Sequence, residues 1–275
     1  MSRPVITFTT DFGPAAPAVC RGVMYGIAPD ALIIDISHQV RRYAIREGAG
    51  TLVFALPYMP IGVHVAVVDP GVGTDRRGIA LKVVRGDMLL GPDNGLLLPA
   101  AERLGGIVAA RALENRAFML PVVTSSFHGR DVFAPIAAHL AMGSPFEAVG
   151  PAIDPATLVR LDLPTPTIRE GELESRITHV LIFGNVTFAG TTADLEAAIG
   201  PLTPGRRVIV EFPAHDGRPA VVETTVWERT FGSVPLGASL LMEDSEGNLS
   251  LADNQGNAAE RLGLALDRPV RIRAA

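Results

Sequence analysis

The sequence predicts an α/β fold, with an N-terminal α/β domain built on a mostly parallel sheet and a smaller β-rich domain after it. Three observations support this prediction. Over about the first 160 residues, short β-branched runs alternate with longer segments of helical periodicity, the pattern of a doubly wound sheet. A polar, proline-bearing segment then interrupts the pattern at 161–175. Beyond it the apolar runs are short and β-rich, as in a small barrel or sandwich.

In the N-terminal half, apolar runs predict strands and periodic segments predict helices. Pro57 and Pro60 close the second helix, and Arg85–Gly86–Asp87 supplies a turn between two strands. Asp131 is predicted to be the N-cap of a helix whose apolar face includes Phe133 and Leu140. The expected strands are 5–9, 32–36, 63–68, 79–84 and 88–90, and the expected helices are 17–27, 45–56, 96–104 and 131–142.

In the C-terminal half, a linker is expected between an N-terminal domain of residues 1–165 and a C-terminal domain of residues 176–275. Pro164, Pro166 and several glutamates mark the linker. After it, only Asn257–Leu262 has the character of a helix. The expected strands are 177–183, 208–212, 220–226, 239–242 and 249–251.

Composition excludes several classes of function. A net charge of −5 without a basic stripe argues against a nucleic-acid partner. No apolar run reaches the length of about 18 residues that a membrane span needs. The first residues carry no signal-peptide hydrophobic segment, and the single cysteine permits no internal disulfide, so we expect a cytoplasmic protein. Cys20 lies in an apolar pattern and is expected to be a small core residue.

The stretch Val67–Arg77, VVDPGVGTDRR, is the first candidate for a reaction centre. Asp69 follows a predicted buried strand, and Arg76 and Arg77 follow a glycine-containing turn. In open α/β sheets, the carboxyl ends of the strands border the ligand crevice. An acid and a base delivered there suit catalysis, while a surface turn with an Asp–Arg ion pair is the structural alternative.

His128 is the second candidate, because it lies on a loop just before a predicted helix. An arginine and a histidine near a bound water favour its hydroxide form, and a carboxylate orients them. A buried, hydrogen-bonded histidine is the structural alternative. A metal hydrolase is a rival function, with Asp11, Asp69, His128 and Asp131 as ligands. Against it, the chain has no HxH or HExxH pair, and Arg76 would repel a cation.

Several short motifs, in order along nearly the whole chain, carry a family resemblance. The sequence resembles the S-adenosylmethionine (SAM) hydrolases, or SAM hydroxide adenosyltransferases, relatives of the SAM-dependent fluorinase and chlorinase. The motifs are Thr10–Gly13, Cys20–Tyr25, Ile34–His38, Val68–Thr74, Pro92–Leu97, Phe127–Asp131, Phe183–Asn185 and Asn254–Ala258.

The resemblance implies a Rossmann-like N-terminal domain, a C-terminal β-barrel and a homotrimer with SAM bound between subunits. It implies that SAM is the substrate, converted to adenosine and methionine, and that no cofactor or metal is needed. The family's catalytic triad corresponds to Asp69, Arg76 and His128, with Arg76 preferred over Arg77 by spacing. The implied substrate-binding residues are Asp11, Tyr43, Phe127, Phe183, Asn185 and Ser245.

The chain departs from the family pattern where the methionine end of SAM would bind. The aspartate that usually precedes Phe-Gly-Asn is missing from His179–Ile182, and Glu246 is a candidate for the lost negative charge. The halogenases have arginines where this chain has Glu246 and Asp253. Two alternatives stay open beside the metal hydrolase: a SAM-dependent halogenase, and a non-catalytic SAM or adenosine sensor.

Overall fold

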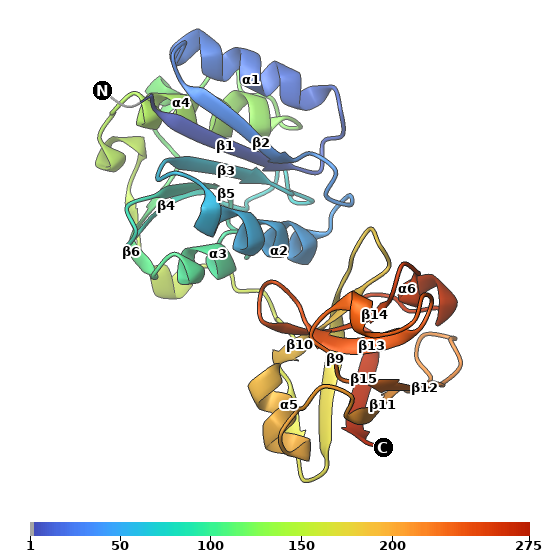
Figure 1. Ribbon diagram of the computed structural model, residues 1–275. Helices are drawn as coiled ribbons and strands as arrows, with labels where there is room; N and C mark the ends of the chain where they lie inside the picture. Colours follow the sequence, from blue (N-terminus) through green and yellow to red (C-terminus); the bar gives the residue numbers. More distant parts are fainter. Residues whose placement is uncertain (1–2) are drawn as a thin grey trace. The chain divides into compact units, whose positions relative to one another are not determined.

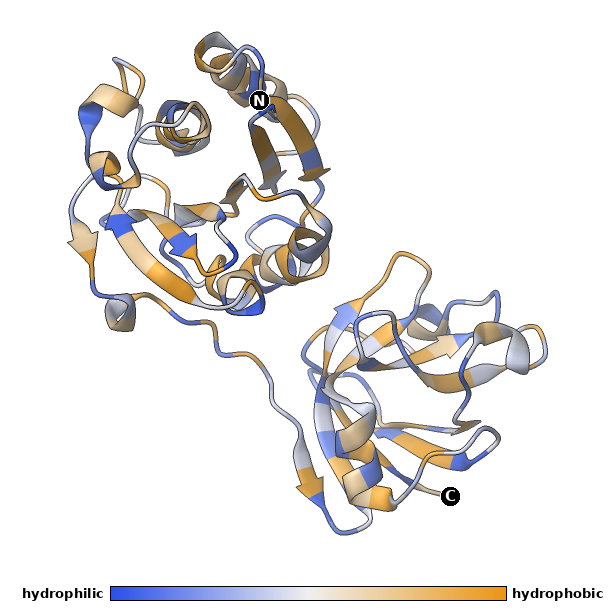
Figure 2. Cartoon of the chain, turned by 60° about the vertical axis from the view of Figure 1, so that its left-hand side comes forward, coloured by the Kyte–Doolittle hydropathy of each residue, from blue (hydrophilic) through white to orange (hydrophobic). Residues whose placement is uncertain are grey.

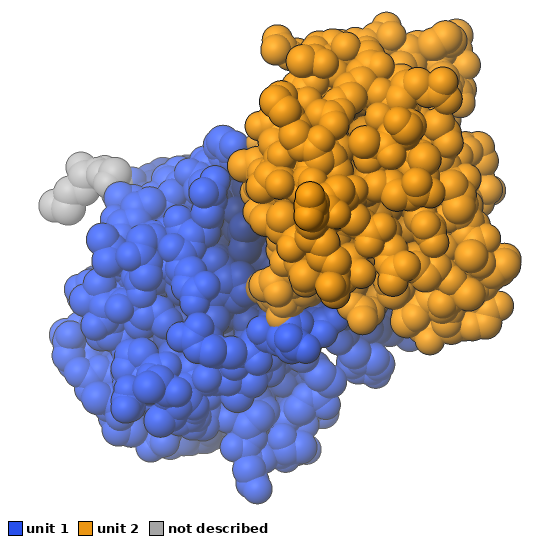
Figure 3. Space-filling model, turned by 90° about the horizontal axis from the view of Figure 1, so that it is seen from below, with its two compact units in different colours: residues 1–162 blue, residues 163–275 orange. Residues whose placement is uncertain are grey.

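The computed structural model describes residues 3–275 and divides the chain into two compact units, residues 1–162 and 163–275 (Figure 3). Residues 1 and 2 lie outside the described part. They begin the N-terminal segment in which no signal peptide is expected. Each unit has its own sheet and its own buried core. None of the helices within residues 3–275 combines the length and apolar character needed to cross a membrane.

The sheet of the first unit has seven strands within residues 3–275, in the order β2-β1-β3-β5-β4-β6-β7. The four strands from β2 to β5 are parallel neighbours, which confirms the predicted parallel sheet. The other three strands pair antiparallel, because β4 and β5 are joined by a tight turn at 84–87 that reverses the chain. The strands are β1 (Val5–Thr10), β2 (Leu32–Ser37), β3 (Val63–Val67), β4 (Gly78–Val83), β5 (Met88–Pro92), β6 (Ile107–Ala112) and β7 (Ala152–Ile153).

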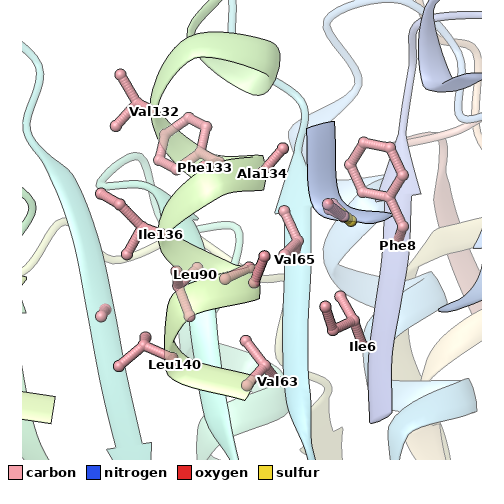
Figure 4. Close-up of a cluster of buried hydrophobic side chains, with 14 of the residues drawn as sticks. Ile6, Phe8, Val63, Val65, Leu90, Val132, Phe133, Ala134, Ile136 and Leu140 are labelled. Carbon is pink, nitrogen blue, oxygen red and sulfur yellow. The ribbon is translucent and has the colours of Figure 1, made fainter. Parts of the chain in front are cut away.

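Helices cover both faces of this sheet, α1 and α4 on one and α2 and α3 on the other (Figure 1). Phe133, Ile136 and Leu140 pack beside Val63 and Val65 of β3 (Figure 4). The helices are α1 (Ala16–Ile27), α2 (Ile45–Ala55), α3 (Leu98–Arg103) and α4 (Ala134–Ala141), with 3₁₀ turns at η1 (Leu56–Tyr58), η2 (Arg116–Phe118), η4 (Phe146–Val149) and η5 (Pro155–Thr157).

Cys20 of α1 is fully buried in the same core, so its predicted role as a core residue is confirmed. Burial raises the pKa of its thiol to about 12, which leaves the sulfur protonated at neutral pH.

The predicted N-cap at Asp131 is wrong. A π-helical turn, η3 (Gly129–Phe133), precedes α4, and Asp131 lies inside it. Pro135 has no N–H to donate to the Asp131 carbonyl four residues earlier, and that carbonyl accepts the Leu120 N–H at 3.0 Å instead. The Asp131 side chain accepts hydrogen bonds from Thr124 in the preceding loop and does not cap the helix.

The second unit is a nearly closed antiparallel barrel. Its main path runs β12-β11-β15-β9-β10-β14-β13, and β8 pairs with β9. A bridge between Trp227 and Leu241 brings the two ends of the path together. Alternating residues of the strands point inward, so polar and apolar bands alternate along them (Figure 2). The strands are β8 (Thr167–Arg169), β9 (Glu172–Val180), β10 (Val186–Thr191), β11 (Arg207–Phe212), β12 (Val221–Val226), β13 (Ser239–Glu243), β14 (Asn248–Asp253) and β15 (Pro269–Ala274).

Two expectations for this half are wrong. Residues 161–175 are not a plain linker, because β8 and the start of β9 form a hairpin there. In addition to α6 (Ala258–Arg261), the unit has a second helix, α5 (Thr192–Ile199), and a 3₁₀ turn, η6 (Phe231–Ser233). The side chains of Thr191 and Asp194 form a capping box at the start of α5, a signal that was present in the sequence.

Candidate active site

The site begins at the carboxyl edge of the parallel strands. β1 ends at Thr10 and is followed by Asp11, while Asp69 stands two residues after the end of β3. β1 and β3 are parallel neighbours, with Thr10 in register with Val67. The two carboxylates are therefore delivered to the same edge of the sheet, the edge at which open α/β sheets bind their ligands.

Asp69 and Arg76 form a largely buried, charge-assisted pair. The Arg76 Nε donates to both carboxylate oxygens of Asp69, at 2.9 and 2.8 Å, and a terminal guanidinium nitrogen also contacts Oδ2. The side chains are only 4% and 12% exposed. This burial favours the functional interpretation over a surface ion pair, because exposed pairs of this kind are solvated on most sides.

The turn between the two residues depends on glycine. Gly73 has φ +77°, and a Cβ there would lie 2.2 Å from the Ser125 carbonyl oxygen. The 69–77 turn therefore packs backbone to backbone against the 124–128 loop. This contact brings Arg76 within reach of His128, although 52 residues separate them in the chain.

Arg76 also contacts His128 directly. A terminal nitrogen of the guanidinium lies 3.1 Å from the His128 Nδ1, and the guanidinium carbon lies 5.3 Å from the centre of the Phe133 ring. The fold thus brings together the three side chains that the sequence predicted as a triad. Their role in catalysis stays a prediction.

The contact fixes the protonation of His128. A guanidinium can only donate, so Nδ1 must accept, which makes the imidazole neutral with its proton on Nε2. Burial and the positive charge of Arg76 lower the pKa of His128 below its ordinary value, while Asp69, Asp131 and the Thr124 backbone act in the opposite direction.

Arg77 points to a different partner. Its Nε and a terminal nitrogen donate to Asp93 at 2.9 and 2.5 Å, and it also donates to the Thr157 carbonyl at 2.8 Å. Adjacent arginines therefore have separate tasks. Arg76 meets His128, whereas Arg77 ties the end of β5 to the segment that follows β7.

Three predicted substrate-binding residues lie on neighbouring loops of the first unit. The Asp11 carboxylate accepts the Tyr43 N–H at 3.0 Å, and Tyr43 itself has a positive φ of 66° and a largely exposed side chain. Phe12 and Phe127 meet edge to face, with ring centres 5.5 Å apart. Asp11 and Tyr43 are thereby linked to the loop that carries His128.

The other polar residues at strand ends have structural partners. The His38 Nδ1 lies 2.9 Å from the Thr10 hydroxyl, and its backbone carbonyl accepts the Gly13 N–H at 3.1 Å. The Asn94 amide donates to the Val68 carbonyl at 2.9 Å. These contacts hold the loops around Asp11 and Asp69 in place.

The remaining predicted substrate-binding residues belong to the second unit. Phe183 lies in the β9–β10 turn with 76% of its surface exposed, next to Ile182 at 93%. Asn185 closes that turn, because its carbonyl accepts the Leu181 N–H at 2.9 Å. Ser245 lies in the exposed β13–β14 turn, whose Asp244 accepts from the Thr187 hydroxyl at 3.5 Å.

The residues of the metal-site alternative do not form one cluster. Across residues 3–275, no group of three or more His, Cys, Asp or Glu side chains is arranged to hold a metal ion. Asp131 is engaged by Thr124 and Arg130, as described below. Asp253, where the halogenases resembled by this chain carry an arginine, is paired with Arg261 at 2.7 to 2.8 Å.

An α/β unit with a buried Asp–Arg–His contact at its carboxyl edge, joined to a β-barrel unit, defines a class of two-domain enzyme. Comparison with known proteins agrees: residues 6–150 match the SAM hydroxide adenosyltransferase N-terminal domain and residues 176–271 match the corresponding C-terminal domain. The chain belongs to the SAM hydroxide adenosyltransferase family.

Individual relatives cover almost the full chain. An (R)-S-adenosyl-L-methionine hydrolase of Salinispora arenicola is 46% identical over 99% of both chains. A fluorinase of Actinopolyspora mzabensis is 26% identical over 98% of this chain and 97% of its own. A crystal structure of an uncharacterized conserved protein from Thermotoga maritima has a TM-score of 0.86 and 32% identity, covering 98% of this chain and 99% of that one.

Proposed function

We propose that this protein is an enzyme that hydrolyses S-adenosyl-L-methionine to adenosine and L-methionine. The contact of Arg76 with both Asp69 and His128 carries the proposal. The identity of the substrate is inferred from the family and from a hydrolase relative that is 46% identical over almost the whole chain.

The chemistry needs a nucleophile and no leaving-group acid. The oxygen of water bonds to C5′ of the ribose as the C5′–S bond breaks, and the bond's electron pair stays on sulfur. Methionine leaves as a neutral thioether, and the attacking water gives up one proton to the solvent as it bonds to C5′. Neutral water attacks carbon slowly, so the site must position the water and favour its hydroxide form.

The residues of the site divide this work between them. Arg76 supplies a permanent positive charge that stabilises hydroxide. The lone pair of His128 Nδ1 is used by Arg76, so the imidazole offers its Nε2–H as a donor to the water oxygen. Asp69 orients the guanidinium and balances its charge.

A halogenase is the nearest rival. A dehydrated halide needs a small pocket of neutral donors, whereas this site places a carboxylate, a guanidinium and a histidine in direct contact. The fluorinase relative is also more distant in sequence than the hydrolase.

Incubation with SAM in heavy-oxygen water, with and without chloride, tests the function. We expect adenosine that carries the heavy oxygen, together with unlabelled methionine, whether or not chloride is added. Both epimers at sulfur should be supplied, because the hydrolase relative's name specifies the (R) form. A 5′-chloronucleoside would indicate a halogenase, and intact SAM after prolonged incubation would indicate a sensor.

The rate should fall at acidic pH. Protonation of His128 removes the Nδ1 lone pair and sets an imidazolium against the Arg76 guanidinium. Because burial and Arg76 lower the pKa of His128, the acidic limb of kcat/KM should have its midpoint below the ordinary histidine value of 6.5. A profile that instead rises as pH falls through this range would contradict a neutral His128.

We also propose that Asp11, Tyr43, Phe127, Phe183, Asn185 and Ser245 bind the nucleoside and methionine parts of SAM, in a cytoplasmic homotrimer whose site is shared between subunits. The exposed apolar tip at Ile182 and Phe183 supports a ligand or subunit contact there. A mass in solution near three times the 29.0 kDa of one chain would support the trimer, and a monomer would contradict it.

A further inference from the structure

We propose that Asp131 is the positioning residue that holds the His128 loop in the place where its imidazole meets Arg76. This inference rests on the proposed hydrolase function, since it assigns a supporting residue to the same site. Nothing in the family resemblance gives Asp131 this task, and the sequence suggested only a helix cap or a metal ligand there.

The Asp131 carboxylate closes the loop from 124 to 130. Its Oδ2 accepts from the Thr124 backbone N–H at 2.8 Å and from the Thr124 hydroxyl at 2.6 Å. Arg130 donates to both carboxylate oxygens, at 2.5 and 3.1 Å. Asp131 itself is fully buried, so these hydrogen bonds must replace the hydration that its carboxylate loses on folding.

Residues on either side of His128 anchor this loop to the neighbouring turns. Ser125 packs against the backbone of the 69–77 turn at Gly73, and Phe127 packs against Phe12. The Arg130 guanidinium lies 5.0 Å from the centre of the Phe127 ring. Asp131 therefore fixes both ends of a loop whose middle touches the Arg76 turn on one side and the Asp11 turn on the other.

Asp131 lies inside the π-helical turn η3 and does not cap its end. Gly129 has no room for a side chain, since a Cβ there would lie 2.7 Å from the Phe12 ring. The segment from His128 to Asp131 is thus packed tightly against the turn that follows β1.

Asp131 also contributes to the charge around His128. The charged groups that face the imidazole are Arg76, Asp69 and Asp131, and the negative charge of Asp131 raises the pKa of His128 against the larger effects of burial and Arg76. Hydrogen bonds from Arg130 and Thr124 outweigh the effect of burial and lower the pKa of Asp131, so its carboxylate is ionised at neutral pH.

Substitution Asp131→Asn tests the proposal. All of the present partners are donors to the carboxylate, so an amide group must leave at least one of them without an acceptor. We expect kcat to fall by about 100-fold, with little change in the KM for SAM, because a displaced catalytic group affects the transition state most. The acidic limb of kcat/KM should move to lower pH, because the negative charge that raises the pKa of His128 is lost.

A matched control separates positioning from general stability. Asp87 is equally buried and also binds an arginine, Arg85, but it pairs with His64 rather than with the 124–130 loop. Asp87→Asn should lower the melting temperature and leave kcat per folded enzyme and its pH profile unchanged. If Asp131→Asn behaves in the same way, Asp131 is a structural residue only and the proposal is overturned.

Thr124→Val and Thr124→Ser keep the proposal testable if Asp131→Asn does not fold. Valine removes the hydroxyl donor but keeps the backbone N–H bond, so a smaller loss of kcat is expected, and serine should restore it. Equal kcat in the valine, serine and wild-type enzymes would then overturn the proposal.

A readout without turnover distinguishes this inference from the proposed function. The imidazole resonances of His128, one of six histidines, can be titrated by NMR in the wild type and in the variants. If the wild type releases no adenosine from SAM, the proposed function fails. The positioning of His128 is still supported if Thr124→Val, which removes no charge, shifts the His128 titration. It is overturned if the titration is the same in Thr124→Val and the wild type.

Discussion

Replacing Arg76 by glutamine is expected to lower kcat by about 1,000-fold, the upper range for loss of one preorganised donor at a reacting oxyanion. Two effects combine in this variant. The positive charge beside the attacking water is lost, and the His128 Nδ1 loses the donor that holds its neutral form. The pKa of His128 should rise at the same time, because Arg76 is one of the two main causes that lower it.

The KM for SAM should change much less than kcat in this variant. The proposed substrate contacts from the first unit are Asp11, Tyr43 and Phe127, none of which bonds to Arg76 in the structure. Single-turnover release of adenosine, with SAM binding measured separately by calorimetry, gives the two quantities.

The neighbouring arginine provides the control. Arg77→Gln removes the same charge one residue later, but Arg77 binds Asp93 and the Thr157 carbonyl and does not reach His128. We expect near-normal kcat from Arg77→Gln. Equal losses in both variants would show that net charge alone matters and that the Arg76–His128 contact has no special role.

The second large effect is expected on stability, from Asp87→Asn. Asp87 and His64 are 0% and 1% exposed, and they form a buried network with Arg85 and Thr7. Asp87 also accepts the Gly62 N–H at 3.2 Å. Breaking a buried ion pair of this kind costs about 3 kcal/mol, because the partner charge is left without compensation. The melting temperature should fall by about 10 °C, measured by calorimetry or circular dichroism.

The same carboxylate should make stability depend on acid pH. Burial raises the pKa of Asp87, but hydrogen bonds from His64 and Arg85 outweigh burial and hold it well below the ordinary value of 3.8. Its contribution is therefore fully present above 3.8 and is lost as the pH falls toward the lower folded-state pKa. Asp87→Asn should show a shallower loss of stability over this acidic range.

An exposed pair of the same type serves as the comparison. Glu102 and Arg160 are 60% and 65% exposed, so Glu102→Gln should cost well under about 1 kcal/mol. Equal losses of stability in Glu102→Gln and Asp87→Asn would contradict the argument that burial makes the Asp87 network strongly stabilising.

Local sequence signals were reliable where a residue's neighbours decide its structure. The apolar runs of β1 to β5 and the helical periodicity of α1 and α2 were read correctly to within a few residues. The hairpin before Met88 followed from Arg85–Gly86–Asp87. The capping box at Thr191 and Asp194 was equally local and could have revealed α5.

The sequence could not show features that depend on distant partners. Asp131 precedes an apolar periodic segment, as a helix cap would. Its actual hydrogen bonds are to residues outside the helix: the backbone carbonyl accepts from Leu120, and the carboxylate accepts from Thr124, seven residues earlier. The contact of the Arg76 guanidinium with the Phe133 ring had no sequence signal either, because the sequence places Phe133 only on an apolar helix face.

By itself, the sequence determined the alternation of the first five strands with their helices, the residue types available for chemistry and, through its motifs, the family. Only the tertiary structure showed that Arg76, which the family's spacing had favoured over Arg77, contacts His128, and that the imidazole's Nδ1 is an acceptor. The physical reason is that secondary structure follows from nearby residues, whereas the direction of a hydrogen bond depends on atoms that the fold brings together from distant positions.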